Sequence, residues 1–296
     1  MRTILVPTDF SAHSTQAAHF AIALGNILSA QVHLLHIGRM PVIPVSVPTY
    51  GITSPFLALE PAMKEMRQEA NVCMKDLTKE LEGAARQFGY HGPIYQTIVE
   101  GEPVEEITRW IEEHEPMCMV MGVTNHSSIY RMLIGSVAGR LLKETDIPIF
   151  AIPSGAVYGG MYKVVFASDF DPNDAKLLHR MNEMLQGHVN EWHVVHVTDN
   201  IEDQFYYDRQ GELVERLTEH LAPASGEIKI QLEVLPEANL LDSIEGYAKK
   251  NHAHLVAFAM SKKNFFERMI DPSVSENALF HLHVPMLFLR AQDSSR

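Results

Sequence analysis

A segment in the first half of the chain has residue types and spacing that suit the binding of a phosphate group. It runs from Gly122 to Ser136, with a second glycine, Gly135, directly before the serine. Glycines let main-chain N–H groups approach an anion closely, and Ser136 can offer a hydroxyl where a helix begins. Asp9 adds a carboxylate in the same half. The pattern therefore predicts a site that binds an anionic ligand.

The same residues also have purely structural interpretations. A carboxylate such as Asp9 often occupies a turn or caps a helix, and a glycine such as Gly135 often precedes a helix. The residues taken one at a time leave both interpretations open.

Short strand-like runs alternate with helix-like stretches around these residues. The predicted strands are 3–6, 31–37, 94–99, 118–122 and 148–152, and the predicted helices are 12–28, 63–88, 103–113 and one that begins at Ser136. This alternation predicts a parallel sheet with helices on both faces. Ligands of such sheets bind beyond the carboxyl ends of the strands, where the winding direction reverses. Asp9 and the loop after Gly122 both follow strand ends, so we expect both at that edge.

The second half of the chain repeats the first. Three segments return with similar residues: 5–11 as 165–171, 32–37 as 192–197, and 146–150 as 283–287. The first two pairs are offset by 160 residues and the third by 137, so the first copy carries an insertion of 23 residues. We interpret the chain as two tandem α/β domains, residues 1–153 and 162–296, each with a doubly wound parallel sheet.

The phosphate-loop residues are replaced in the second copy. Gly122, Asn125, Gly135 and Ser136 are matched there by Ala259, Lys262, Pro272 and Ser273. Proline has no main-chain N–H to donate, and the adjacent Asp271 adds a negative charge. We therefore expect anion binding in the first copy only.

The insertion and the helix after it need separate interpretations. Residues 40–61 contain five prolines among apolar residues. The prolines argue against a helix or a strand interior, and the apolar residues predict a segment that packs on the protein. Simple packing, a lid over a pocket and a contact surface for the other domain remain open. In the following helix, apolar residues recur at steps of three and four from Met63 to Phe88, which predicts a stripe facing the core.

The chain resembles the universal stress protein family along essentially its whole length. Nucleotide-binding members of that family carry a glycine, two residues, a second glycine, nine residues, then a glycine and a small hydroxylic residue. Gly122, Gly135 and Ser136 match this pattern, while Asn125 stands where the second glycine belongs. The resemblance implies two Rossmann-like domains related by a pseudo-twofold and packed through strands at 147–152 and 284–289. Single-domain relatives achieve that arrangement as dimers.

The resemblance also implies a ligand. It assigns Asp9, Gly122, Asn125, Gly135 and Ser136 to the binding of ATP or a related adenine nucleotide, with Mg²⁺ as an accompanying ion. Asp9 would accept a hydrogen bond from a ribose hydroxyl or an adenine amine. Asparagine adopts positive φ more readily than most residues, so Asn125 can preserve the loop shape.

Composition excludes several classes of partner. A net charge of −13 and a pI near 5.6 argue against binding to nucleic acid or to an anionic membrane surface. The two cysteines, Cys73 and Cys118, lack a metal-type spacing. Apolar runs are too short for a signal peptide or a membrane helix. We expect a cytoplasmic protein whose thiols are structural.

Catalytic and metal chemistry have weak support in the sequence. His252 with His254, and His281 with His283, have same-face spacing on a strand, but no carboxylate or thiol cluster accompanies them. No nucleophile and base pair stands out. We predict a stress-linked regulatory protein that hydrolyses ATP slowly if at all. The alternatives are an interaction module of the same fold that acts through protein partners, and an ATP-using enzyme; a further homodimer is open.

Overall fold

The computed structural model describes residues 2–38, 55–126, 131–133, 136–156, 158–168, 174–198, 211, 228–236, 240–260 and 283–290. The first half contains β1 (Thr3–Pro7), α1 (Ala12–Leu28), β2 (Gln31–Gly38), α2 (Pro55–Phe88), β3 (Ile94–Glu100), α3 (Pro103–His114), β4 (Cys118–His126), β5 (Arg131–Leu133), α4 (Ser136–Glu144) and β6 (Ile149–Pro153). The second half contains β7 (Lys163–Ala167), α5 (Asp174–Met184), β8 (Glu191–Thr198), β9 (Lys229–Pro236), α7 (Leu240–Lys250), β10 (Leu255–Met260) and β11 (Met286–Arg290).

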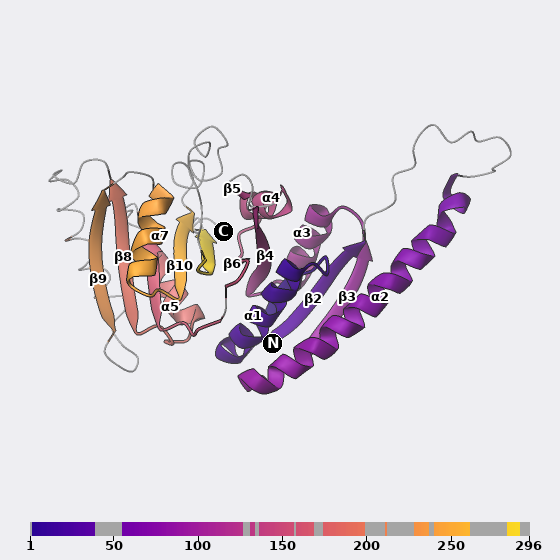
Figure 1. The fold of residues 1–296 in the computed structure, drawn as a ribbon, viewed down its shortest axis with the longest axis horizontal. Helices are drawn as coiled ribbons and strands as arrows, with labels where there is room; N and C mark the ends of the chain where they lie inside the picture. The colour runs from indigo at the N-terminus through magenta and orange to yellow at the C-terminus, as the bar shows by residue number, and fades with distance from the viewer. Residues whose placement is uncertain are drawn as a thin grey trace.

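Within the described residues, the strands form one continuous sheet of two similar halves (Figure 1). The strand order is β3-β2-β1-β4-β6-β11-β10-β7-β8-β9, with β5 paired to β4 off this path. Strands within each half of this path are parallel, and the halves meet in the antiparallel pair β6–β11, where Phe150 lies opposite Leu287. Counted outward from this pair, the strands of the two halves follow in the same order of equivalent strands, as a pseudo-twofold axis requires. The predicted fold class and the contact between terminal strands are confirmed.

Two apolar layers cover the two faces of the sheet. The residues of each strand alternate between them, so Ile4 and Val6 face α1 and α2 while Leu5 faces α3 and α4. In the second half, α5 shares the layer of α1, and α7 shares the layer of α3. Helices on both faces explain why the central strands are nearly continuous apolar runs.

Local sequence signals fix the helix that follows β1. Ser11 is the N-cap of α1, and its hydroxyl accepts a hydrogen bond from the Ser14 N–H at 3.3 Å. Ser29 ends the helix in a left-handed conformation, with its N–H donating to the Gly25 carbonyl. The first turn of α1 is therefore anchored directly after the end of β1.

Two local predictions are wrong. Strand β4 does not end at Gly122 but continues to His126, where it pairs with β5 as an antiparallel hairpin. Residues 55–61 are helical, because α2 begins at Pro55 and includes Pro61. Pro55 is the first residue of α2, a position that tolerates proline, whereas Pro61 lies in the second turn and removes one main-chain hydrogen bond. Burial further along α2, at Leu77 and Leu81, stabilises the helix despite that loss. Residues 39–54 lie outside the described part.

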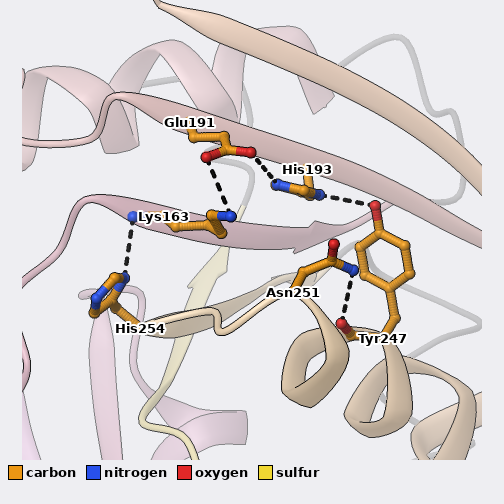
Figure 2. Close-up of polar contacts among 6 residues, drawn as sticks. All are labelled: Lys163, Glu191, His193, Tyr247, Asn251 and His254. Atoms are coloured by element: carbon orange, nitrogen blue, oxygen red, sulfur yellow. Dashed lines mark hydrogen bonds and ion pairs between the residues drawn. The ribbon is translucent and has the colours of Figure 1, made fainter.

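The histidines that recur in the repeat are structural parts of the sheet. Figure 2 shows His193 between Glu191 and Tyr247: its Nε2 donates to Glu191 Oε1 at 2.9 Å, and its Nδ1 lies 2.8 Å from Tyr247 Oη. Lys163 Nζ lies 3.2 Å from the other Glu191 oxygen. The first repeat has a neutral version of this network, in which His33 bonds to Thr97.

Some sequence predictions fall on residues that the structure does not describe. The second copy of the sequence also predicts helices at 210–221 and 272–280, and these residues, apart from Gly211, lie outside the described part. The domain limits 1–153 and 162–296 remain predictions. Among the described helices, none combines the length and apolar character needed to cross a membrane.

Candidate functional site

A cavity of about 580 Å³ lies beyond the carboxyl ends of the strands in the first repeat. It opens beside β1 and β4, where the chain first winds toward β2 and then returns to the other side of β1. The first turns of α1 and α4 line it through Ser11, Ser14, Val137 and Ala138. The cavity therefore occupies the switch point at which open α/β sheets bind ligands.

Asp9 lies at the edge of this cavity and also forms a turn. Its Oδ1 accepts a hydrogen bond from the Ser11 N–H at 3.0 Å. Burial raises the pKa of the Asp9 carboxyl, but hydrogen bonds from Ser11 and Ser14 lower that pKa further, so the net shift is downward. Asp9 is thus a carboxylate at neutral pH. The structural and the ligand-binding interpretations of this residue are compatible.

The turn after β1 is fixed by contacts to β2. His36 Nδ1 donates to the Thr8 carbonyl at 2.8 Å, and the rings of His36 and Phe10 are in contact, tilted by 31° with centroids 4.3 Å apart. Phe10 has φ of 63°, a conformation that non-glycine residues seldom adopt, and its N–H donates to Thr8 Oγ1. The second repeat has the equivalent of the His36–Thr8 hydrogen bond, since His196 Nδ1 donates to the Ser168 carbonyl at 2.8 Å. His36 therefore orients the loop that carries Asp9.

Gly122 lines the cavity and allows two elements to approach closely. A Cβ atom at this position would lie 2.4 Å from the carbonyl oxygen of His13, in the first turn of α1. No side chain fits there without a backbone shift. The visible constraint on Gly122 is packing of α1 on β4.

The remaining predicted residues lie along the chain between β4 and α4. Asn125 is in β4, opposite Met132 of β5, and Ser136 is the first residue of α4. Gly135 lies outside the described residues. The free N–H groups at the start of α4 favour an anion at this side of the cavity.

Helix α2 supplies a cavity wall that the sequence interpretation missed. Met63, Met66 and Ala70 line the cavity, although the periodicity had assigned them to a core stripe. That stripe is buried further along the helix, at Leu77 and Leu81, whereas Met66 is 42% exposed. Helical periodicity identifies the apolar face of a helix but not what covers that face. No signal in the sequence therefore separates the part of the stripe that lines the cavity from the part that is buried in the core.

An ion pair closes the α2 side of the cavity. Arg67 donates to both carboxylate oxygens of Glu100 at the end of β3, with Nη2 at 2.9 Å from Oε2. Arg67 lowers the pKa of the Glu100 carboxyl, and Glu100 raises the pKa of the guanidinium. The ion pair is bidentate, which fixes the relative orientation of the two side chains.

A comparison with protein-family models identifies the chain. The model described as the universal stress protein family matches residues 1–153 and 161–290. The chain belongs to the universal stress protein family. Among curated relatives, universal stress protein MJ0531 of Methanocaldococcus jannaschii is 30% identical over 152 residues, which cover 51% of this chain and 81% of that protein. Universal stress protein YxiE of Bacillus subtilis is 29% identical over 150 residues, 50% of this chain and 97% of YxiE.

Solved structures support the fold of the tandem universal stress protein. A universal stress protein from Archaeoglobus fulgidus superposes with a TM-score of 0.67 at 18% identity, covering 98% of this chain and 97% of that one. A putative universal stress protein from Pseudomonas aeruginosa gives a TM-score of 0.55 at 13% identity, covering 98% and 93%. Both matches extend over the two repeats.

The two repeats of this universal stress protein differ at the matched edge. Asp174 of the second repeat stands where the first has Ser14, and it accepts a hydrogen bond from Ser168 Oγ at 2.5 Å while almost fully buried. Ala259 replaces Gly122 and is also buried. Lys262, Asp271, Pro272 and Ser273 lie outside the described residues. Among the described residues of the whole chain, no three His, Cys, Asp or Glu side chains are grouped to hold a metal ion.

Proposed function

We propose that the first repeat binds ATP or a related adenine nucleotide in the switch-point cavity, and that the protein acts in a stress-linked regulatory role. The observation that carries the proposal is the position of the cavity, where a carboxylate, Asp9, lies near the first turns of α1 and α4. Helix N-termini attract anions through free N–H groups and the helix dipole.

The apolar side of the cavity suits an aromatic base. Ile37, Ile98, Met63 and Met66 line that side. Methionine sulfur makes favourable contacts with aromatic rings, and its flexible side chain fills irregular gaps. The volume of about 580 Å³ lies in the range typical of small-molecule pockets.

The polar side would hold the sugar and the phosphates. We expect Asp9 to accept from a ribose hydroxyl, and we place the phosphates toward Gly122, Asn125, Gly135 and Ser136. Arg67 is already paired with Glu100, so we expect Mg²⁺ to accompany the phosphates and offset their charge. Nothing in this scheme needs a catalytic residue, and any hydrolysis of ATP would be slow.

We propose no nucleotide site in the second repeat. The buried Asp174 carboxylate lies where an anion would approach, and like charges repel strongly at low dielectric. The second repeat is therefore proposed to serve a structural or interaction role.

One observation favours a second candidate function, an interaction module that binds no nucleotide. Asp9 and Gly122 each have a structural role that is complete without a ligand, in a turn and in helix packing. Such a module would act through protein partners.

Calorimetric titration of nucleotide-stripped protein with Mg-ATP tests the proposal. We expect saturable binding near one site per chain. Asp9→Asn keeps an oxygen to accept from the Ser11 N–H but removes the charge, so weaker binding by this variant separates ligand contact from folding. Gly135→Asp places a negative charge in the loop and should abolish binding.

The repeat supplies a matched control. Asp169→Asn makes the same change at the corresponding position of the second repeat and should leave binding unchanged. Absence of binding to wild-type protein at millimolar Mg-ATP would reject the nucleotide proposal in favour of the interaction module. Turnover of many ATP molecules per protein would instead support an enzyme.

A further inference from the structure

Two of the helices that begin at the cavity, α1 and α4, end against the second repeat. Helix α1 contributes Ser11 and Ser14 to the cavity, and α4 contributes Val137 and Ala138. The last carbonyl groups of any helix lack partners within the helix and need donors from elsewhere. For both helices, side chains of the second repeat supply such donors.

Arg290, the last residue of β11, caps the end of α4. Its Nη2 donates to the Leu142 carbonyl at 3.0 Å and also to the Lys143 carbonyl, and its Nη1 donates to Asp146 Oδ1 at 3.3 Å. A cation at a helix C-terminus also interacts favourably with the helix dipole. Arg290 is itself held, because its carbonyl accepts from Arg180 Nη1 of α5 at 3.2 Å.

Gln186, two residues after the end of α5, caps the end of α1. Its Nε2 donates to the Leu28 carbonyl at 2.8 Å. The segment between the repeats holds the other end of the same helix. Ser154 Oγ lies 2.7 Å from His13 Nδ1, and the Gly155 N–H donates to Gln16 Oε1 at 3.2 Å.

Among the described residues, the first repeat has no equivalent of these two contacts at the matched positions. The position matched to Arg290 in the first repeat is Pro153, which has no side-chain donor. The position matched to Gln186 is Asn26, whose Nδ2 donates to the Phe88 carbonyl within its own repeat at 3.0 Å. At these two matched positions, the second repeat therefore holds helices of the first without reciprocal contacts.

We propose that Arg290 and Gln186 are positioning residues for the ligand site of the first repeat. They hold α4 and α1 in the placement that forms the cavity, so ligand binding and docking of the repeats are coupled. The inference rests on the proposed nucleotide function. Because coupling is reciprocal, a bound ligand must also tighten the contact between the repeats.

Binding measurements on three variants test the coupling. Arg290→Met removes the donors but keeps much of the side-chain volume, and we expect the Kd for Mg-ATP to rise about tenfold, within the usual range of coupling between sites. Arg290→Lys retains a charged donor and should recover part of the affinity. Gln186→Glu places an acceptor against the Leu28 carbonyl and should also weaken binding.

Arg140→Met is the matched control. Arg140 is on α4 itself, and within the described part of the chain its ion pair is with Glu144 of the same helix. Its removal therefore leaves the contact between the repeats intact. We expect an unchanged Kd. All titrations are run well below the unfolding temperature, where a loss of stability alone does not change the Kd.

Amide hydrogen exchange supplies a second readout. Mg-ATP should slow exchange in β11 and in residues 154–156 of the wild-type protein, and should do so less in Arg290→Met. If the wild type binds nucleotide but Arg290→Met and Gln186→Glu bind with the same Kd, the inference is wrong. If the wild type binds no nucleotide, the proposed function fails, and amide exchange measured without ligand then tests the positioning role by itself. Arg290→Met must accelerate exchange in α4 more than Arg140→Met does. Equal exchange rates in the two variants overturn the inference.

Discussion

At the scale of single residues, the same side chain often meets a structural and a functional demand. Asp9 completes a turn and lines the cavity, and His36 holds that turn to β2. Cys118 is fully buried, which raises the pKa of its thiol, so it is an inert core residue as the composition predicts. Gly122 is tightly constrained, because a Cβ atom at this position would meet backbone atoms of His13 and Ser14.

We expect Gly122→Ala to destabilise the protein by about 1–3 kcal/mol, the usual cost of overpacking. The new methyl would lie 2.4 Å from the His13 carbonyl oxygen, so α1 must shift away from β4. Urea unfolding followed by circular dichroism measures the change. Gly83→Ala on α2 is the control, since the nearest atom there is 3.9 Å away at the flexible end of Arg86. That change should be neutral or stabilising, as alanine favours helices.

At the scale of elements, a polar network ties β7 and β8 to α7 in the second repeat. The side chain of His193 is 1% exposed, and both of its ring nitrogens have partners, Glu191 and Tyr247 (Figure 2). Burial raises the pKa of the Tyr247 hydroxyl to about 12, so Tyr247 stays neutral and can donate to His193. Buried polar groups with partners specify one arrangement of the strands and the helix above them.

We expect the network to make stability depend on pH through Glu191. Burial raises the pKa of this carboxyl, but hydrogen bonds from His193 and Lys163 lower it further, and the net shift is downward from 4.5. The carboxylate therefore stabilises the fold above about pH 4.5, and this contribution is lost as pH falls through the lowered pKa. Urea unfolding should show Glu191→Gln less stable than wild type at pH 7, with a smaller difference at pH 3.

Glu183→Gln is the comparison for that experiment. Glu183 pairs with His179 on the exposed surface of α5, at 3.5 Å, and exposed pairs contribute little. A difference for Glu191→Gln that stays constant from pH 7 to pH 3 would contradict the role of the charge.

At the scale of the whole molecule, the central antiparallel pair makes one sheet from two repeats. All five residues of β6 are buried, and β6 uses one edge for β4 and the other for β11. Removing the second repeat would expose an apolar strand edge, which is a strong template for pairing with another chain.

We expect residues 1–153, expressed alone, to associate through β6 as antiparallel dimers, in place of the contact to β11. Sedimentation velocity at concentrations of about 10–100 µM measures the mass. A folded monomer throughout that range would contradict the expectation. Whether the full chain forms a further homodimer, and whether it works in the cytoplasm, remain predictions from the sequence.

Sequence alone determined the repeat, the doubly wound fold and the edge at which Asp9 and Gly122 meet. Strand and helix periods are local properties, and parallel strands place their carboxyl ends on one edge. Only the tertiary structure decided that Met63 and Met66 line a cavity, that Gly122 is needed for packing on α1, and that Arg290 caps α4. Those facts depend on which surfaces approach one another, and residues as distant as Arg290 and Leu142 carry no local signal of their contact.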